Sequence, residues 1–151
     1  MDKTILAKAA SYCAYQERTQ QEVRERLKKW NIYGDETEEI IAELIAQNYL
    51  NEERYAKAFA GGKFRMKNWG SLKIKQELKR KGLTDYNISS AIKELDKEDY
   101  EGELMQLIQK KYESIKQSEP DPWKQKQKTA RYAISKGFET ELVWKAIEKV
   151  L

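Results

Sequence analysis

The amino-acid sequence predicts an all-α protein built from three tandem three-helix repeats, with about nine helices and no β-sheet. One observation is helical periodicity along almost the whole chain, with no alternating run that indicates a strand. A second observation is a five-residue apolar pattern that recurs after 51 positions and again after a further 55. Its members are Val23, Leu27, Ile32, Ile41 and Leu44, then Ile74, Leu78, Leu83, Ile92 and Leu95, then Thr129, Ala133, Phe138, Ile147 and Val150. A period near fifty residues is typical of stacked units that cannot bury their apolar faces alone. It favours an extended binding surface over an enzyme pocket.

In the first unit, residues 1–50, the helical pattern is clearest near the C-terminal end. Thr37, Ile40, Ile41, Leu44 and Ile45 follow the i, i+3, i+4, i+7, i+8 spacing of one helix face. This stripe predicts an amphipathic helix over about 35–47, and we expect Asp35 to be its N-cap.

The second unit, residues 51–97, follows the first without a flexible linker. A helix is expected from about Gly70, with Ile74 and Leu78 on its buried side. Gly82 is expected just past its C-terminus, because glycine adopts the left-handed conformation found there without strain. Asp85 is the expected N-cap of the next helix.

The third unit, residues 98–151, begins with a longer polar helix that reaches about Gln117. Pro120 and Pro122 end it, since each proline disfavours helix in the residue before it. Gly137 repeats the role expected of Gly82. A final helix stripe comprises Val143, Ala146, Ile147 and Val150.

Composition argues against most enzyme classes. The chain of 151 residues has no histidine and one cysteine, Cys13, which excludes His-based catalysis and most zinc sites. We therefore expect no enzyme activity, no metal and no cofactor, and a buried Cys13 in a reduced compartment. No secretory signal or membrane helix is evident, so we expect a cytoplasmic protein that does not bind membranes.

The basic residues are concentrated in the middle of the chain. Residues 54–81 hold ten basic side chains and one acid, whereas residues 35–53 hold seven acids and no base. A second basic segment runs from Lys124 to Lys136. Such a surface suits a phosphate backbone. It also suits an acidic protein groove, and a solvated helix face remains the plain alternative.

Aromatic residues lie among these charges, and their helical positions separate core from surface. Tyr55 and Phe59 fall on one stripe of a helix and are expected in the core. Phe64 and Trp69 remain as candidates for stacking on bases. Gly61 and Gly62 lie inside the same predicted helix, and close helix packing is their ordinary explanation.

Three segments resemble one known family. They are Tyr12 to Thr19 with Glu22-Val23, then Asn48 to Ala56, then Gly70 with Ile74, Glu77-Leu78 and Lys81-Gly82-Leu83. In their order and spacing they resemble the RecX family, bacterial regulators of the RecA recombinase. The likeness covers almost the whole chain and weakens over residues 100–130. Ser71 stands where the family often has proline, and Gly61-Gly62 stands where bulkier residues are expected.

The resemblance implies a curved, elongated array of three three-helix repeats that binds along the groove of the RecA filament on single-stranded DNA. It implies reduced filament growth, ATP hydrolysis, strand exchange and co-protease function, and so a place in DNA repair, homologous recombination and the SOS response. No catalytic activity is implied. We expect a monomer that contacts RecA and single-stranded DNA, with double-stranded DNA as a further partner.

Charge and helical position, not a family motif, select the expected contact residues. The main ones are Lys63, Arg65, Lys67, Lys73, Lys79 and Arg80, with Arg18 and Arg24 as secondary ones. Two rival hypotheses stay open. One is a general DNA-binding repeat module that acts without RecA, and the other is a helical adaptor for an acidic protein partner.

Overall fold

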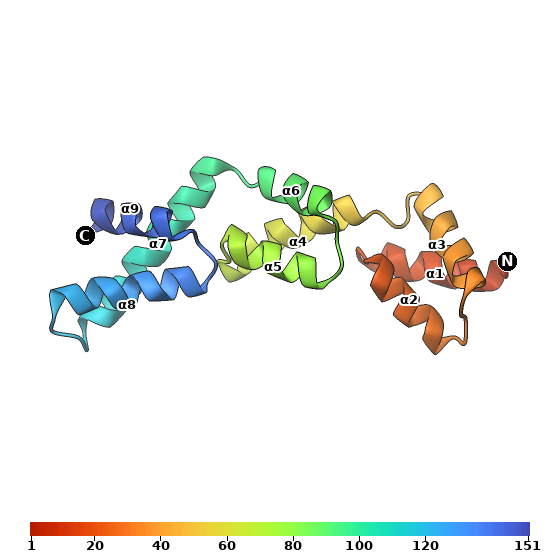
Figure 1. Ribbon diagram of the computed structural model, residues 1–151, viewed down its shortest axis with the longest axis horizontal. Coiled ribbons are helices and arrows are strands. Elements are labelled where there is room, and N and C mark those ends of the chain that lie inside the picture. The colour runs from red at the N-terminus through yellow and green to blue at the C-terminus, as the bar shows by residue number, and fades with distance from the viewer.

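The computed structural model describes residues 1–151 and contains nine α-helices and no strand, as the sequence predicts. The helices form an elongated, curved row of three groups, with the two termini at opposite ends (Figure 1). Repeat 1 comprises α1 (Lys3–Tyr15), α2 (Gln20–Lys29) and α3 (Asp35–Ala46). Repeat 2 comprises α4 (Glu52–Lys67), α5 (Ser71–Arg80) and α6 (Asp85–Lys93). Repeat 3 comprises α7 (Lys97–Lys116), α8 (Pro122–Ser135) and α9 (Thr140–Val150). No helix is both long and apolar enough to cross a membrane.

Helix ends follow local side-chain chemistry. Thr19 caps α2 in a capping box with Glu22, in which the side chain of each residue accepts a hydrogen bond from the backbone N–H of the other. The expected N-caps Asp35 and Asp85 are wrong by one residue. Gly34 and Thr84 hold those positions, and the aspartates are the first helical residues. There their carboxylates still face the positive end of the helix dipole.

The predicted C-terminal glycines are confirmed. Gly82 has φ +87° and Gly137 has φ +101°, a region that side chains with a Cβ rarely adopt.

Two separate cores hold the molecule together. Repeat 1 has its own cluster of eight buried residues, among them Leu27, Ile40 and Leu44. Repeats 2 and 3 share a single cluster of 18 buried residues. An aromatic chain runs through the shared core: the Phe64 and Tyr100 rings lie 5.6 Å apart, and those of Tyr100 and Phe138 lie 5.2 Å apart. Repeats 2 and 3 are therefore one packed body, and repeat 1 is another.

The joint between repeats 2 and 3 is a direct contact of two backbones. Gly70 N–H donates to the carbonyl of Lys136 (2.8 Å), and Leu72 N–H donates to the carbonyl of Gly137 (3.0 Å). A Cβ on Gly70 would lie 2.3 Å from the carbonyl carbon of Gly137, which is too close for any side chain. Both glycines are therefore required by the close approach of these two segments of the chain.

A buried polar network locks the same joint. The Tyr100 hydroxyl accepts from Ser71 N–H (2.9 Å) and donates to the Glu139 carboxylate, which also accepts from the Ser71 hydroxyl (2.9 Å). Burial, with Glu139 adding to it, raises the pKa of Tyr100 to about 12. The hydrogen bond to Tyr100 needs the backbone N–H of Ser71. A proline at this position has no N–H and could not form this bond.

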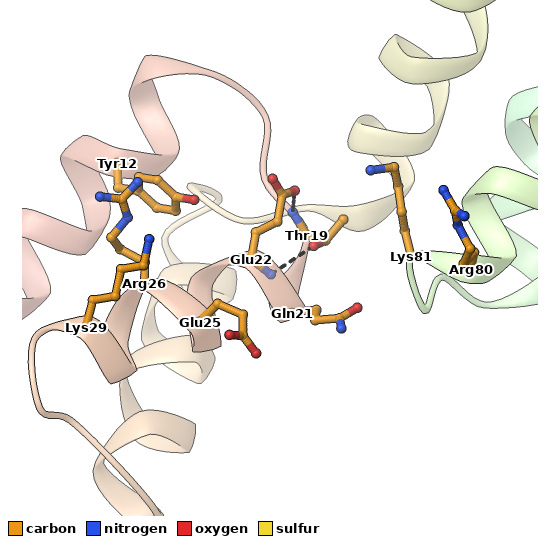
Figure 2. A pocket seen from close by; sticks show the side chains of 9 residues that line it. All are labelled: Tyr12, Thr19, Gln21, Glu22, Glu25, Arg26, Lys29, Arg80 and Lys81. Atoms are coloured by element: carbon orange, nitrogen blue, oxygen red, sulfur yellow. Dashed lines mark hydrogen bonds between the residues drawn. The ribbon is translucent and has the colours of Figure 1, made fainter.

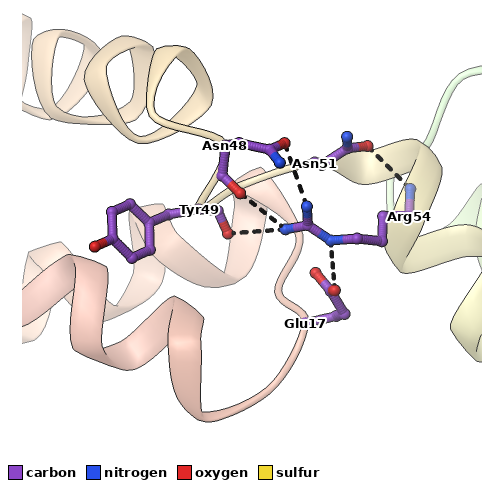
Figure 3. Close-up of polar contacts among 5 residues, drawn as sticks. All are labelled: Glu17, Asn48, Tyr49, Asn51 and Arg54. Atoms are coloured by element: carbon purple, nitrogen blue, oxygen red, sulfur yellow. Dashed lines mark hydrogen bonds and ion pairs between the residues drawn. The ribbon is translucent and has the colours of Figure 1, made fainter.

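Repeat 1 joins repeat 2 through polar contacts centred on Arg54 (Figure 3). Its guanidinium donates to the side chain of Asn48 (3.2 Å) and to the carbonyls of Asn48 (3.1 Å) and Tyr49 (3.3 Å). The same group donates to the carboxylate of Glu17 at the end of α1. One arginine thus ties the α3–α4 connection to the α1–α2 connection. We call this group the Arg54 clasp.

The second helices of the three repeats lie in a row. Figure 1 shows α8, α5 and α2 along the lower edge of the view. The C-terminal end of α8 meets the start of α5 at Gly70. The turn after α5 meets the start of α2, since a Cβ on Gly82 would lie 3.7 Å from the Gln21 side chain. The three helices therefore follow one another head to tail along one edge.

Replacing Gly70 with alanine should destabilise the protein by about 2 kcal/mol or more, because the added methyl group collides with the backbone of Gly137. Urea denaturation followed by circular dichroism measures the change. The matched control is Gly62→Ala in α4, where a Cβ meets nothing within 4 Å. That variant should gain up to about 1 kcal/mol from helix propensity. Equal stability of the two variants would contradict the proposed role of the Gly70 contact.

Replacing Arg54 with glutamine should loosen repeat 1 from repeats 2 and 3, because no packed core crosses this joint. Small-angle X-ray scattering should show a broader distribution of interatomic distances, and amide exchange should rise over residues 48–51. Arg65→Gln removes the same charge from the same helix without touching the clasp, so it should leave both readings unchanged. An unaltered scattering profile for Arg54→Gln would refute the clasp.

Candidate nucleic-acid interface

Three lysines gather over two aromatic rings where α4, the α4–α5 turn and α5 meet. Lys73 Nζ lies 4.6 Å and Lys63 Nζ 5.0 Å from the centre of the Trp69 ring. Lys63 and Lys81 each lie 5.5 Å from the centre of the Phe59 ring. The two rings meet edge to face at 6.3 Å. We call these five residues the lysine–aromatic cluster.

The backbone after α4 places Trp69 in this cluster. Asn68 adopts the left-handed conformation (φ +57°) and ends α4. The chain then folds back, and Trp69 N–H donates to the carbonyl of Lys63 in the last turn of α4 (3.2 Å). The indole therefore lies beside the lysine that precedes it by six positions and the lysine that follows it by four.

The cluster can bind an anionic, ring-bearing ligand. None of its three lysines forms an ion pair within the chain, and both rings are only partly buried. A cation over an exposed ring contributes about 0.5–1 kcal/mol, so a phosphate group or a base can displace it at little cost. Phosphates would meet the ammonium groups while a base stacks on indole.

The expected contact residues do not share one face. Lys63 and Lys73 come together over Trp69, and Lys67 is exposed at the end of α4. Arg65 lies on the opposite side of α4, against Gly61 and facing the acidic first turns of α7. Lys79 lies six residues after Lys73 on α5, about 120° around that helix.

The three remaining arginines have partners within the chain. Arg24 forms an ion pair with Glu38 (2.9 Å), and this hydrogen bond raises the pKa of Arg24 and lowers that of Glu38. Arg18 donates to the carbonyl of Tyr12 (3.1 Å) and its guanidinium lies 3.7 Å from the centre of the Tyr12 ring. Arg80 pairs with Glu77 (2.8 Å). Each must exchange an internal contact to bind a ligand.

A second group of cations faces a pocket of about 320 Å³ between α2 and the end of α5 (Figure 2). Arg26 and Lys29 come from α2, whereas Arg80 and Lys81 come from the far side of the pocket. Glu22 and Glu25 lie between the two pairs and lower the net charge. Sequence reasoning missed Arg26 and Lys29, because only the head-to-tail packing of α5 and α2 brings them opposite Arg80.

Two sequence-based interpretations of this region are wrong, and a third holds only in part. Phe64 is not a stacking candidate, because it is 5 % exposed and packs on Tyr100. Phe59, expected in the core, does pack against it and stacks on Tyr55, but it is partly exposed beneath two lysines. Gly61 and Gly62 do not mark close helix packing. A Cβ on Gly62 would meet nothing within 4 Å, and the three atoms nearest one on Gly61 all belong to the Arg65 guanidinium.

The chain offers few groups for other chemistry. No set of three or more histidine, cysteine or acidic side chains is placed to hold a metal ion. Cys13 is buried as expected, and that burial raises its pKa.

The fold and this surface together define a class: an all-α repeat protein with cationic groups where α4 meets α5 and between α2 and the end of α5. Comparison with family models is more specific. Residues 6–44, 51–92 and 98–147 match models described as the first, second and third three-helix domains of RecX. The chain belongs to the RecX family.

Relatives named Regulatory protein RecX cover most of the chain. That of Clostridium beijerinckii is 37 % identical over 134 residues, which is 89 % of this chain and 62 % of the relative. That of Clostridium perfringens strain 13 is 33 % identical over 122 residues, covering 81 % and 57 %. That of Bacillus cytotoxicus is 31 % identical over 142 residues, covering 94 % and 52 %. The chain thus spans between half and two thirds of the length of these relatives.

A solved structure supports the fold. The crystal structure of RecX from Lactobacillus salivarius superposes with a TM-score of 0.87 at 23 % identity, covering 96 % of this chain and 93 % of that one.

Replacing Lys63 and Lys73 together with glutamine should weaken binding to single-stranded DNA and reduce its salt dependence. Each lost phosphate contact lowers the slope of log affinity against log salt by about 0.7. Fluorescence anisotropy with a labelled oligothymidylate at several salt concentrations measures this slope. The control is Lys145→Gln with Lys149→Gln, which removes the same charge from the hollow between α7 and α9. An equal loss in both double variants would mean that net charge, not the cluster, governs binding.

Proposed function

We propose that this chain binds the RecA filament on single-stranded DNA and negatively modulates the recombinase, ATPase and co-protease activities of RecA. Family membership supports a regulatory role, since the curated relatives are named as regulatory proteins. The observation that carries the proposal is the lysine–aromatic cluster, which offers unpaired cations and partly exposed rings where α4 and α5 meet.

An elongated array suits a helical nucleoprotein filament. The groove of such a filament presents phosphates and acidic protein surface along its length. Three repeats, with bounds we place at 1–50, 51–97 and 98–151, can contact successive subunits at once. Several modest contacts made by one chain then add to a much higher overall avidity. Electrostatic attraction between the groove and the cationic edge would speed association and make it sensitive to salt.

We propose a regulatory role without catalysis, exerted by occupying the groove. A bound array would hinder the addition of RecA subunits at a growing end and the movements that accompany ATP hydrolysis. Few molecules suffice for such an effect, because one bound array stops growth beyond it.

A general DNA-binding module that acts without RecA is the second candidate. One observation favours it: the cluster lysines have no acidic partner in the chain, so they can bind phosphate without any contact to protein. Such a module would inhibit RecA only by covering the DNA.

Titrating this protein into RecA well below the RecA concentration should inhibit the ATP hydrolysis that single-stranded DNA stimulates. RecA of Clostridium beijerinckii is the partner to use, since a relative of this chain comes from that organism. Charge reversal at Lys73 and Arg80 should move the inhibition curve to about tenfold higher protein concentration or more, with Lys145→Glu and Lys149→Glu as the control.

The stoichiometry decides between the candidates. Inhibition that begins only when the protein saturates the DNA would support the general DNA-binding module. No inhibition at any ratio, with DNA binding intact, would refute the proposed regulation of RecA.

A further inference from the structure

The outer face of α8 carries positive charge that the central cluster does not use. This helix, Pro122–Ser135, contains four basic residues and no acidic one. Lys128 is held by Glu119 (2.8 Å), whereas Lys124 and Arg131 are exposed and form no ion pair. A helix face with unpaired cations and no acid of its own attracts a polyanion over its whole length.

A large aromatic surface lies at the start of the same helix. Trp123 is 59 % exposed, although its ring is stacked on Trp144 of α9 with 6.2 Å between centres and 20° between planes. Its backbone is fixed, because Trp123 N–H donates to the capping side chain of Asp121 (3.0 Å). The ring is thus held in place and still presents most of its surface to solvent.

The ring and the cations lie on adjoining rows of α8. Trp123 and Arg131 are eight residues apart, which places them about 80° from each other around the helix. By the same helical geometry, Lys124 and Arg131 lie on nearly the same line along the helix. The buried side of the helix, formed by Gln125, Thr129 and Ala133, faces the other way. One exposed surface therefore combines an indole with two free cations.

We propose that this surface, Trp123 with Lys124 and Arg131, is a second binding site for single-stranded nucleic acid, located in repeat 3. An unpaired base can stack on the exposed indole, while the two cations contact the phosphates next to it. Duplex DNA would leave the indole unused, since its bases are already stacked on one another. The proposal rests on the proposed function in taking single-stranded DNA as the ligand, and it assigns repeat 3 a contact with the same strand.

The position of α8 supports a strand that runs from one site to the other. The end of α8 meets the start of α5 at the Gly70 joint. Lys73 of the lysine–aromatic cluster lies three residues after Gly70, in the first turn of α5. Repeats 2 and 3 share one core, so the two sites keep a fixed separation. A strand long enough to reach both would gain avidity that a short strand cannot.

Binding of labelled oligothymidylates by the full chain, without RecA, tests the proposal. Trp123→Ala should weaken binding of a long oligonucleotide about tenfold or more, as expected for the loss of one stacked base. Lys124→Glu with Arg131→Glu should weaken it further and lower its salt dependence. Both changes lie on the surface, and circular dichroism verifies that the fold is intact. Lys145→Glu with Lys149→Glu on α9 is the control for charge alone.

Oligonucleotide length provides the second readout. The Trp123→Ala loss should be large for a long strand and small for one that only the central cluster can hold. Unchanged affinity for the long strand in Trp123→Ala and in the double charge reversal would overturn the proposal. A loss no larger than in the α9 control would do the same. Weaker binding to RecA filaments with unaltered DNA affinity would also overturn it, because the surface would then contact protein.

The outcome is separable from that of the proposed function. RecA inhibition that persists in variants without the repeat 3 contact would leave the regulatory role in place. DNA binding through Trp123 without RecA inhibition would support this site and refute the regulation of RecA.

Discussion

The contact between the backbones of Gly70 and Gly137 is the constraint on which the rest of the structure depends. It brings two turns so close that neither can carry a side chain, and it pairs their amide and carbonyl groups directly. The Ser71–Tyr100–Glu139 network then satisfies the polar groups buried around it. Because α5 begins and α8 ends at this contact, it aligns the second helices and gives repeats 2 and 3 one core. The placement of the two proposed nucleic-acid sites relative to each other, one in repeat 2 and one in repeat 3, depends on that contact.

Charge pairing within the chain occupies some cations of the candidate interface and leaves others free. One acid of α3 and one of α4 form ion pairs within the chain: Glu38 binds Arg24, and Glu53 binds Lys57, which Glu94 also contacts. The same hydrogen bonds lower the pKa of Glu38 and Glu53 and raise that of Lys57. Part of the basic block along the sequence is thus paired with acids, whereas Lys63, Lys73 and Lys81 of the lysine–aromatic cluster form no ion pair.

Much of the fold could be predicted from the sequence, because helical periodicity, turn glycines and the repeat period are local signals. Val23, Ile74 and Thr129 are indeed buried at corresponding places in α2, α5 and α8. The candidate site was harder to predict from the sequence, since it depends on contacts between residues that are distant in the chain. Nothing near Phe64 in the chain reveals that Tyr100 covers it, and nothing near Gly70 reveals Gly137. Helix position also placed Phe59 inside. It does pack against the shared core, although the fold of the α4–α5 turn leaves its outer side under lysines.

The division into two cores has a consequence for the order in which the chain acquires structure during synthesis. Repeat 1 contains every residue of its own core, so it can fold as soon as it leaves the ribosome. Repeat 2 cannot complete its core in the same way, because Phe64 and Gly70 await Tyr100 and Gly137 from a segment translated later. Until then its apolar surface and its basic helices are exposed together. The nascent chain is therefore most vulnerable to misassociation between the completion of α6 and that of α9.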